Sequence, residues 1–494
     1  MTHFITGLEH DCNIQGLLLP QVLNKIINKN KNYLTMKKIF LNYAVVLFGA
    51  AVTITSCTTK TDPAPTVTSK EVIIKTNITG TRQLVKDSTY VLEGNIFVTG
   101  TINIQAGTII KGDKLTKGAL IISQGGKINA VGTPTQPIVF TSRMEPGLRA
   151  AGDWGGVIVV GKAPVNQTDP TVEGLTQPLH YGGGTNPADN SGTIQYCRFE
   201  FGGIALQPDN EINGLTFCAV GSGTTVDHVQ VSFAGDDSFE WFGGNVNAKY
   251  LIAYCGLDDE YDTDFGYSGH VQFALGVRNP RIADVSTSNG FESDNNATGT
   301  LDTPITAAIF SNVTLIGPWK TSADKNVSSN FGAGMHIRRN SSISAFNSVF
   351  AGWNTGLLLD ATTTYANATS GSLAIQNCAL VASKVIAVNG ANGVTAQQAL
   401  DFFNTSGFGN QVIADNATAG ISSSFYDATK IGTAAIPTSF LPATGSTLLG
   451  AAKFTNSKLQ DSFFDKTPTF IGAFGATDWT KESWTNFDPQ NTVY

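Results

Sequence analysis

Residues 236–242 read Asp-Asp-Ser-Phe-Glu-Trp-Phe, and residues 258–264 read Asp-Asp-Glu-Tyr-Asp-Thr-Asp. The two copies begin 22 residues apart, and a looser third copy, Gly-Phe-Glu-Ser-Asp, occupies residues 290–294. Such a repeat is typical of a β-solenoid, in which one coil stacks on the next and equivalent residues form ladders. The repeat therefore predicts a solenoid that places several carboxylates side by side.

Large apolar residues extend the same register beyond the acidic copies. Steps of 22, 30, 44 and 22 residues separate, in order, Phe239, Tyr261, Phe291, Met335 and Leu357. A β-sandwich also uses short strands and turns, but it does not return an apolar residue to one local context repeatedly. A column of stacked interior side chains does. We therefore expect an all-β fold, a right-handed parallel β-helix (a β-solenoid) over residues 76–475 with inserted loops.

Two segments near the end of the chain depart from the strand pattern. Residues 395–403 have apolar residues at helical spacing and predict a short helix that packs over the solenoid. Residues 476–494 are rich in aromatic residues, and we interpret them as a C-terminal cap that covers the open strand edges at the end of the solenoid.

The N-terminal region has the pattern of a secretion signal at residues 36–57. Met36-Lys37-Lys38 is basic, residues 39–54 are apolar, and the segment ends in Ile54-Thr55-Ser56-Cys57. It resembles a bacterial lipoprotein signal, which implies lipidation at Cys57; a plain secretory signal with an incidental cysteine is the alternative. A signal normally starts at the initiator methionine, so we interpret residues 1–35 as a mis-assigned extension. Residues 58–75, rich in Thr with two Pro, predict a tether.

The resemblance to lipoproteins also predicts a location and a membrane partner. Lipid on Cys57 would anchor the chain outside the cytoplasm, in the periplasm or at the cell surface. Lipoprotein sorting rules favour the outer membrane, because residue 58 is Thr and not the Asp associated with inner-membrane retention.

Composition excludes several classes of function. The net charge of −7 argues against a nucleic-acid partner, which calls for a basic face, and no P-loop or nucleotide fingerprint is present. The chain has six cysteines and no CxxC spacing, so a zinc site is not expected. We expect buried free thiols, with disulfides as the alternative, at Cys197, Cys218, Cys255 and Cys378.

Strand parity sorts the acidic residues into columns. If Phe239, Tyr261 and Phe291 face the core, then Glu240, Asp262 and Glu292 face outward, because successive side chains of a strand alternate. Asp264 and Asp294 form the next outward column. The following copy, Gly-Met-His-Ile-Arg at residues 334–338, adds His336 to the first column and Arg338 to the second. The acidic face is thus predicted to end in basic residues.

Three interpretations of the acidic columns remain open. The first is a solvated stripe that discourages aggregation. The second is a Ca²⁺ site, because hard cations take six to eight oxygen ligands. Its candidate ligands are Asp236, Asp237, Asp258, Asp259, Asp262 and Asp264. The third is catalysis by paired carboxylates on a glycosidic bond or in a lyase step. Its candidate residues are Glu240, Asp262, Asp264 and Arg338.

A ligand-binding interpretation adds aromatic and ionic candidates. Loops at 266–280 and 317–330 are expected to be insertions that flank the columns, and exposed aromatic side chains on such loops can stack on sugar rings. The candidate ligand-binding residues are Trp241, Tyr267, Glu292, Asp294, Trp319 and His336. Arg338 either pairs with Asp294 as a structural salt bridge or binds a uronate carboxylate.

Several motifs, taken together in order, resemble a known group of proteins. They are Gly-Asp-Trp-Gly-Gly at 152–156, the segments 235–244 and 262–269, Ile-Gly-Ala-Phe-Gly at 471–475 and Asp-Trp-Thr at 478–480. This set resembles uncharacterised Gram-negative surface or secreted lipoproteins with a pectin-lyase-like solenoid. The resemblance implies fold and location more than activity. Polygalacturonase-type hydrolases carry similar acidic pieces, but in the reverse order.

Together these observations predict a lipid-anchored extracytoplasmic β-helix that binds a glycan or another extracellular ligand along an acidic face, with Ca²⁺ as the expected cofactor. A polysaccharide lyase or glycoside hydrolase that uses the same face is the first alternative. A structural or adhesive surface protein is the second.

Overall fold

The computed structural model describes residues 70–175, 177–207, 210–321, 323–383, 385–387, 392–433 and 439–494. The expected extension, signal sequence and Cys57 lie outside these residues. Of the helices that the structure describes, none has the length and apolar character that a bilayer crossing demands. The first strand, β1 (Lys70–Ile74), pairs with β3, so the predicted tether is wrong for its last residues, which belong to the fold.

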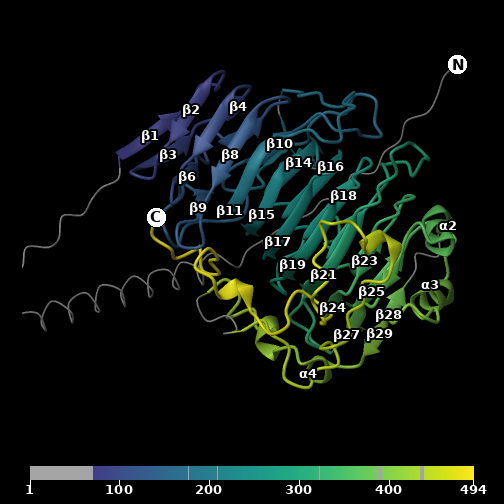
Figure 1. Ribbon diagram of the computed structural model, residues 1–494. Helices are drawn as coiled ribbons and strands as arrows, with labels where there is room; N and C mark the ends of the chain where they lie inside the picture. Colours follow the sequence, from purple (N-terminus) through teal and green to yellow (C-terminus); the bar gives the residue numbers. More distant parts are fainter. Residues whose placement is uncertain are drawn as a thin grey trace, which may run out of the picture. The chain divides into compact units, whose positions relative to one another are not determined.

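The described chain forms stacked coils of parallel strands (Figure 1). One ten-stranded sheet, here called sheet B, runs in chain order through β4 (Asn95–Val98), β7 (Ala119–Ile122), β10 (Gly156–Val160), β14 (Leu215–Val220), β16 (Phe239–Gly244), β18 (Tyr261–Asp264), β20 (Phe291–Ser293), β22 (Ala333–Ile337), β25 (Thr355–Leu359) and β28 (Val385–Ala387). The register pairs each member of the predicted apolar column with the next. The predicted solenoid is therefore confirmed.

The other large sheet, sheet A, carries the longest strands. Its strands are β1 to β3 (β2 Thr81–Leu84, β3 Ser88–Leu92), β5 (Thr101–Ile104), β6 (Ile109–Gly112), β8 (Lys127–Val131), β9 (Ile138–Ser142), β11 (Gly192–Glu200), β15 (Thr225–Ser232), β17 (Asn247–Tyr254), β19 (His270–Val277), β21 (Ile309–Ile316), β23 (Ser344–Phe346), β24 (Val349–Ala351), β26 (Ile375–Gln376), β27 (Ala379–Val381) and β29 (Gln411–Ile413). A small antiparallel pair, β12 (Ala205–Gln207) and β13 (Asn210–Glu211), completes the sheets. Strand β19 shows that the expected insertion at 266–280 is wrong: His-Val-Gln-Phe-Ala-Leu-Gly-Val is a full coil strand.

The long strands of sheet A bend at one residue each. The bends lie at positions with positive φ, and the strand register skips them, as between the pairs Gln195–Asp227 and Cys197–Val229. The bend residues within strands are Tyr196, His228, Tyr250, Phe273 and Asn312. Asn347 and Asn377 take the same place in later coils, where they separate β23 from β24 and β26 from β27. A positive φ is uncommon outside glycine, and asparagine tolerates it better than bulky residues do. The bend lets one continuous strand follow the corner of the coil.

Helices close the end of the solenoid. The predicted helix is confirmed as α3 (Ala396–Phe403), which begins at Thr395 with a capping box to Gln398. It packs on β25 and β28 beside α2 (Thr362–Ser370), which the sequence did not predict. The apolar side of α3, with Phe402 and Phe403, belongs to the main core.

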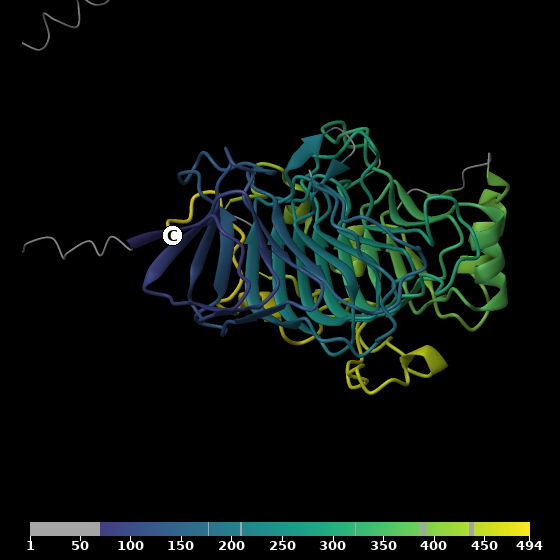
Figure 2. The same ribbon diagram turned by 90° about the horizontal axis from the view of Figure 1, so that it is seen from above.

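The C-terminal segment does not cap the solenoid, and the last coil strand, β29, ends well before the predicted boundary at residue 475. We call residues 442–494 the strap. It runs back along sheet A toward the first coils, as the yellow trace in Figures 1 and 2 shows. Three solenoid amides, Asn347, Gln272 and Gln230, each bond both backbone groups of one strap residue: Lys453, Asp465 and Asn486 respectively. Near its end, Arg149 bonds the carbonyl oxygens of Pro489 and Thr492. The predicted cap is therefore wrong, because backbone groups of this segment find their partners along the flank.

Candidate functional site

Four consecutive strands of sheet B bring the predicted acidic columns together. The register pairs Glu240 with Asp262, Asp262 with Glu292, and Glu292 with His336. Asp264 lies at the end of β18, and Asp294 and Arg338 directly follow β20 and β22. The predicted outward columns are therefore confirmed. We call these residues, with the aspartates at the turns before the strands, the acidic ladder.

A second ladder lies at the turn before these strands. In successive coils, Asn213, Asp237, Asp259 and Asn289 occupy equivalent positions, two residues before the core column. The side-chain oxygen of each accepts a hydrogen bond from the backbone N–H of the next coil: Asn213 from Asp237 at 3.3 Å, Asp237 from Asp259 at 2.7 Å, Asp259 from Asn289, and Asn289 from Ala333 at 2.9 Å. The pairs of adjacent aspartates thus have a structural task that explains part of the 22-residue repeat.

The outer members of this turn ladder also donate hydrogen bonds to neighbouring carboxylates. The Asn213 amide donates to Glu240, and the Asn289 amide donates to Glu292 at 3.1 Å. Asp237 and Asp259 hold the middle positions and have no such donor to offer. Beside them, Asp262 Oδ1 and Asp258 Oδ1 are buried and accept no hydrogen bond from the described residues. The middle of the acidic ladder therefore contains carboxylate oxygens without donors among the described residues.

The acidic ladder is sheltered, which contradicts the fully solvated stripe. Asp237 is 7% exposed, Glu240 5% and Asp259 3%. Part of the cover comes from the long connection between β10 and β11, whose Asn166 bonds the backbone of Phe265 and the Asn295 side chain and carbonyl. Carboxylates in so dry a setting need protons, cations or basic neighbours, because burial disfavours the charged form.

Burial and mutual repulsion raise the pKa of most carboxyl groups in the ladder. Burial is the larger cause, and neighbouring carboxylates add to it. The pKa values raised well above their ordinary range are those of Asp236, Asp237, Glu240, Asp259, Asp262 and Asp264. The pKa of Asp258 is raised to about 6 and that of Glu173, from the covering connection, to about 7. A bound cation would offset this repulsion.

The other end of the ladder is neutralised by basic residues. Arg338 Nε lies 2.9 and 3.0 Å from the two carboxylate oxygens of Asp294, and its Nη2 bonds Glu292. Arg339 Nη1 lies 2.8 Å from Asp294. These contacts confirm the predicted Arg338–Asp294 pair. Burial alone would raise the pKa of Glu292, but the hydrogen bond from His336 and the charge of Arg338 lower it overall.

His336 joins the ladder to the last coils. Its Nδ1 lies 3.6 Å from Glu292 and its Nε2 3.3 Å from Asp360, which the Asn392 amide also bonds. Burial would lower the pKa of His336, but these two carboxylates raise it overall. The predicted ligand-binding residues Glu292 and His336 are thus paired with each other, and Asp294 is paired with Arg338 and Arg339.

The carboxylates of the ladder can hold metal ions. Three groups of three have ligand oxygens within 4.8 Å of one another: Asp236 with Asp237 and Asp258, Asp237 with Glu240 and Asp262, and Asp259 with Asp262 and Glu292. Five of the six predicted metal ligands take part, and Asp264 does not. Oxygen-only groups of this kind suit hard divalent cations such as Ca²⁺. The donor set therefore fits the expected cofactor.

The three aromatic residues predicted to bind a ligand differ in their exposure. Trp241 and Tyr267 are fully buried and stack on each other in the core, with ring centroids 5.3 Å apart, so their assignment to ligand binding is wrong. Trp241 lies two residues after Phe239, and strand parity points it inward. Trp319 is partly exposed and packs edge-on against Phe331.

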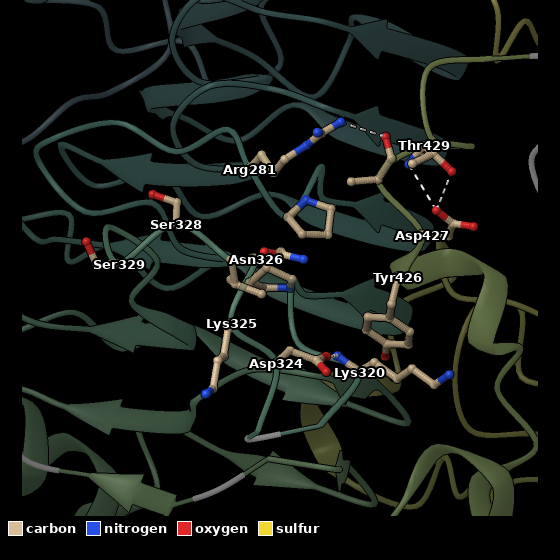
Figure 3. A pocket seen from close by; sticks show the side chains of 14 residues that line it. Arg281, Lys320, Asp324, Lys325, Asn326, Ser328, Ser329, Tyr426, Asp427 and Thr429 are labelled. Carbon is tan, nitrogen blue, oxygen red and sulfur yellow. Dashed lines mark hydrogen bonds between the residues drawn. The ribbon is translucent and has the colours of Figure 1, made fainter.

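The predicted loop at 317–330 does connect β21 to β22, and it lines a cavity of its own. This cavity of about 810 Å³ also takes in residues 280–281 and 426–429 (Figure 3). Its charged lining is mixed: Arg281, Lys320 and Lys325 face Asp324 and Asp427. Asp324 accepts the backbone N–H groups of Lys320 and residue 321, so it serves the fold of the loop.

Sequence reasoning missed several ionic residues that adjoin the ladder. They are Glu173, Glu211, Asp284, Arg339 and Asp360. Strand parity would point Arg339 inward, next to the outward Arg338, but Arg339 lies beyond the end of β22 with a positive φ and pairs with Asp294. Glu173 lies in the covering connection, outside the strand repeat, and no local pattern marks it.

Stacked coils of parallel strands define the class of parallel β-helix proteins. Residues 76–422 match the family described as "Pectate-lyase like beta helix domain", and the chain belongs to that family. Among solved structures, the chain is similar to "Crystal structure of pectate lyase Pel9A", with 14% identity, a TM-score of 0.35, and coverage of 77% of this chain and 88% of that chain. No curated protein matches the chain.

Proposed function

We propose that the protein is a lipid-anchored, extracytoplasmic β-helix that binds an acidic glycan through Ca²⁺ held on the acidic ladder. One observation carries the proposal: the turn ladder changes from asparagine to aspartate at its two middle positions. Asparagine would accept the same backbone hydrogen bond without a charge. Aspartate at positions 237 and 259 adds negative charge beside Asp262, whose Oδ1 is buried without a donor.

A bound cation would offset the electrostatic repulsion between these carboxylates. Two like charges at the spacing of adjacent coils, ~4.8 Å, repel by roughly 3 to 4 kcal/mol at an effective dielectric near 20. Asp237 and Asp262 each belong to two of the three carboxylate groups, so a cation between them would neutralise several charges at once. The presence of so many sheltered carboxylates, some of them without hydrogen-bond donors among the described residues, favours a cation site over a proton-sharing cluster that serves only the fold.

The negative charge of the acidic ladder determines which kind of glycan a bound Ca²⁺ would bridge to the protein. An acidic face repels a polyanion unless a cation bridges them, and Ca²⁺ accepts carboxylate and hydroxyl oxygens from a ligand alongside those of the protein. Uronate-containing polysaccharides supply both kinds of oxygen. The family description, pectate-lyase-like, is compatible with such a ligand.

Binding is preferred to cleavage because of Arg338. A lyase needs a group that is free to take a proton from the substrate, whereas Arg338 holds Asp294 and Glu292 in ion pairs. A lyase or hydrolase that uses Glu240 or Asp262 is the alternative function, and the same experiment separates the two.

The test begins with Ca²⁺ alone. We expect calorimetric binding of Ca²⁺ to the full chain, a rise in melting temperature, and loss of both in Asp262→Asn. Asp87→Asn, at an exposed turn far from the ladder in sequence, is the matched control. Mg²⁺ should bind more weakly, because it accepts fewer protein oxygens.

The second step adds polysaccharides. Polygalacturonate should retard the protein in affinity electrophoresis only when Ca²⁺ is present, and neutral dextran should not. Ultraviolet absorbance of unsaturated uronates and new reducing ends report cleavage. Cleavage that Asp262→Asn abolishes would replace binding by catalysis. The absence of Ca²⁺ binding would overturn the proposal.

A further inference from the structure

A column of aromatic rings stands on the outer side of sheet A. Tyr196, His228, Tyr250 and Phe273 come from β11, β15, β17 and β19. Their ring centroids are 4.4, 4.3 and 5.0 Å apart, and all three pairs are stacked. The column thus runs along the solenoid axis at the bend of each coil.

The bend itself does not require aromatic residues. Later coils make the same bend with Asn312, Asn347 and Asn377, which tolerate positive φ with less strain. A left-handed backbone at a bulky residue costs roughly 1–2 kcal/mol, comparable to what one stacked pair returns. The rings do support the fold, because Phe273 is buried in an apolar cluster and Tyr196 and Tyr250 pack against it. Tyr196 and Tyr250 are only partly buried, so the column also leaves aromatic surface that the bend does not require.

The strap forms the opposite wall of a cavity beside this column. The cavity, of about 690 Å³, is lined by His228, Tyr250 and Phe273 on one side and by strap residues from 465 to 482 on the other. Trp479 and Trp484 stand edge-on to the column, with centroids 5.4 Å from Tyr250 and His228 respectively. The two tryptophans thus hold the strap against the aromatic column, and the cavity lies beside these contacts.

The polar groups around the cavity are acceptors and hydroxyl groups. Asp465 and Glu482 line it together with three threonines, at positions 467, 469 and 477. Burial and then the charges of Asp227, Asp465 and Glu482 raise the pKa of Tyr250, in keeping with the two carboxylates that line the cavity. Asp227 holds His228 at Nδ1, and among the described residues nothing bonds His228 Nε2.

We infer that this cavity binds a saccharide unit that carries no negative charge, a neutral or amino sugar. Aromatic walls with a few hydroxyl and carboxylate groups are a usual lining for a small polar ligand, and the volume fits one. Carboxylates accept hydrogen bonds from sugar hydroxyl or ammonium groups but repel uronates. The site is on sheet A and is separate from the acidic ladder, so it does not depend on the cation proposed there.

The test uses the full chain, three trisaccharides and tryptophan fluorescence, because Trp479 lines the cavity. The probes are cellotriose, a glucosamine trimer and a galacturonate trimer. We expect quenching by at least one of the first two, without Ca²⁺, and none by the third. Tyr250→Phe keeps the ring and its stacking, and Glu482→Gln keeps the size of an exposed side chain. Each should weaken binding by about tenfold at an unchanged melting temperature.

Two controls separate this site from the rest of the molecule. Tyr365→Phe, on α2, and Asp262→Asn, on the acidic ladder, should both leave the affinity unchanged. The inference is overturned if neither neutral nor amino trimer binds at about 10 mM, which corresponds to an affinity weaker than roughly −3 kcal/mol. It is also overturned if binding survives both cavity variants or is lost in Asp262→Asn. If Tyr250→Phe fails to fold, Glu482→Gln alone decides.

Discussion

The carboxylate of Asp237 accepts a hydrogen bond from the backbone N–H of Asp259, one coil further along the solenoid, with Oδ1 and N 2.7 Å apart. This bond gives the acidic residue a structural task that an uncharged amide performs at Asn213 and Asn289. The charge at position 237 is therefore separable from its role in the fold. Substitutions that differ only in charge can test each role alone.

Asp237→Asn should stabilise the protein in the presence of a chelator. The asparagine oxygen keeps the bond to Asp259, and its amide offers Asp262 the donor that this residue lacks, so repulsion falls. We expect a gain of about 1 kcal/mol or more in the free energy of unfolding, together with loss of stabilisation by Ca²⁺. Asp237→Ala should instead cost about 1–3 kcal/mol, because the Asp259 amide is left unpaired. Denaturant melts with and without Ca²⁺ measure the stability of both variants. Equal effects of the two substitutions would contradict the claim that the charge of residue 237 and its hydrogen bond to Asp259 have separate roles.

The metal-free protein should lose stability as the pH rises from about 4 to about 7. The folded-state pKa of Asp258 is raised from 3.8 to about 6, and that of Glu173 from 4.5 to about 7. A group with a raised pKa binds more protons in the folded state than in the unfolded state. Its contribution to folding stability is therefore fully present below its unfolded-state pKa and is lost as the pH rises through its folded-state pKa. Melting temperatures in chelator should fall over this range. Saturating Ca²⁺ should flatten the decline, since the cation replaces the protons, and a flat profile in chelator would be incompatible with these shifts.

Arg338→Met should destabilise the fold more than removal of an exposed cation. Asp294 and Glu292, both sheltered, would lose their main counter-charge, and breaking such a pair costs about 3–5 kcal/mol when fully buried. Because Arg338 is 24% exposed on its side chain, we expect the lower part of this range. Lys75→Met is the control, since the exposed Lys75–Glu93 pair contributes at most ~1 kcal/mol. Urea melts compare the two variants. Similar losses in the free energy of unfolding would contradict a structural role for the Arg338 ion pairs.

Local pattern was enough to predict the coils and the acidic columns, because side chains alternate with a period of two and coils repeat along the chain. The same parity places Trp241 with Phe239 in the core, yet its aromatic character suggested a ligand contact. Glu173 could not be found, since it reaches the ladder through a long connection with no repeat. The strap could not be predicted either. Residues that bond across it, such as Gln230 of the solenoid and Asn486 of the strap, are far apart in sequence and share no local motif.

Cys57→Ala should release the protein from the membrane fraction. If residue 57 carries lipid, metabolic labelling with a fatty-acid analogue should mark the wild-type chain and not the variant. A chain anchored by one modified residue loses its membrane affinity with the lipid, because the acyl chains supply the apolar area. Labelling that survives the substitution, or a soluble wild-type chain, would contradict the predicted lipoprotein signal.

Gln272→Ala should loosen the strap. The buried Gln272 amide donates to the Asp465 carbonyl at 2.7 Å and accepts from the Asp465 N–H at 2.8 Å, so its loss leaves two backbone groups without partners. We expect a cost of about 1–3 kcal/mol and faster proteolysis within residues 442–494. Gln83→Ala, on an exposed strand, should have neither effect. Because Asp465 also lines the aromatic cavity, the same variant should weaken trisaccharide binding, whereas Ca²⁺ binding at the acidic ladder should be unchanged. Loss of both activities together would mean that the substitution unfolds the coils and does not act through the strap.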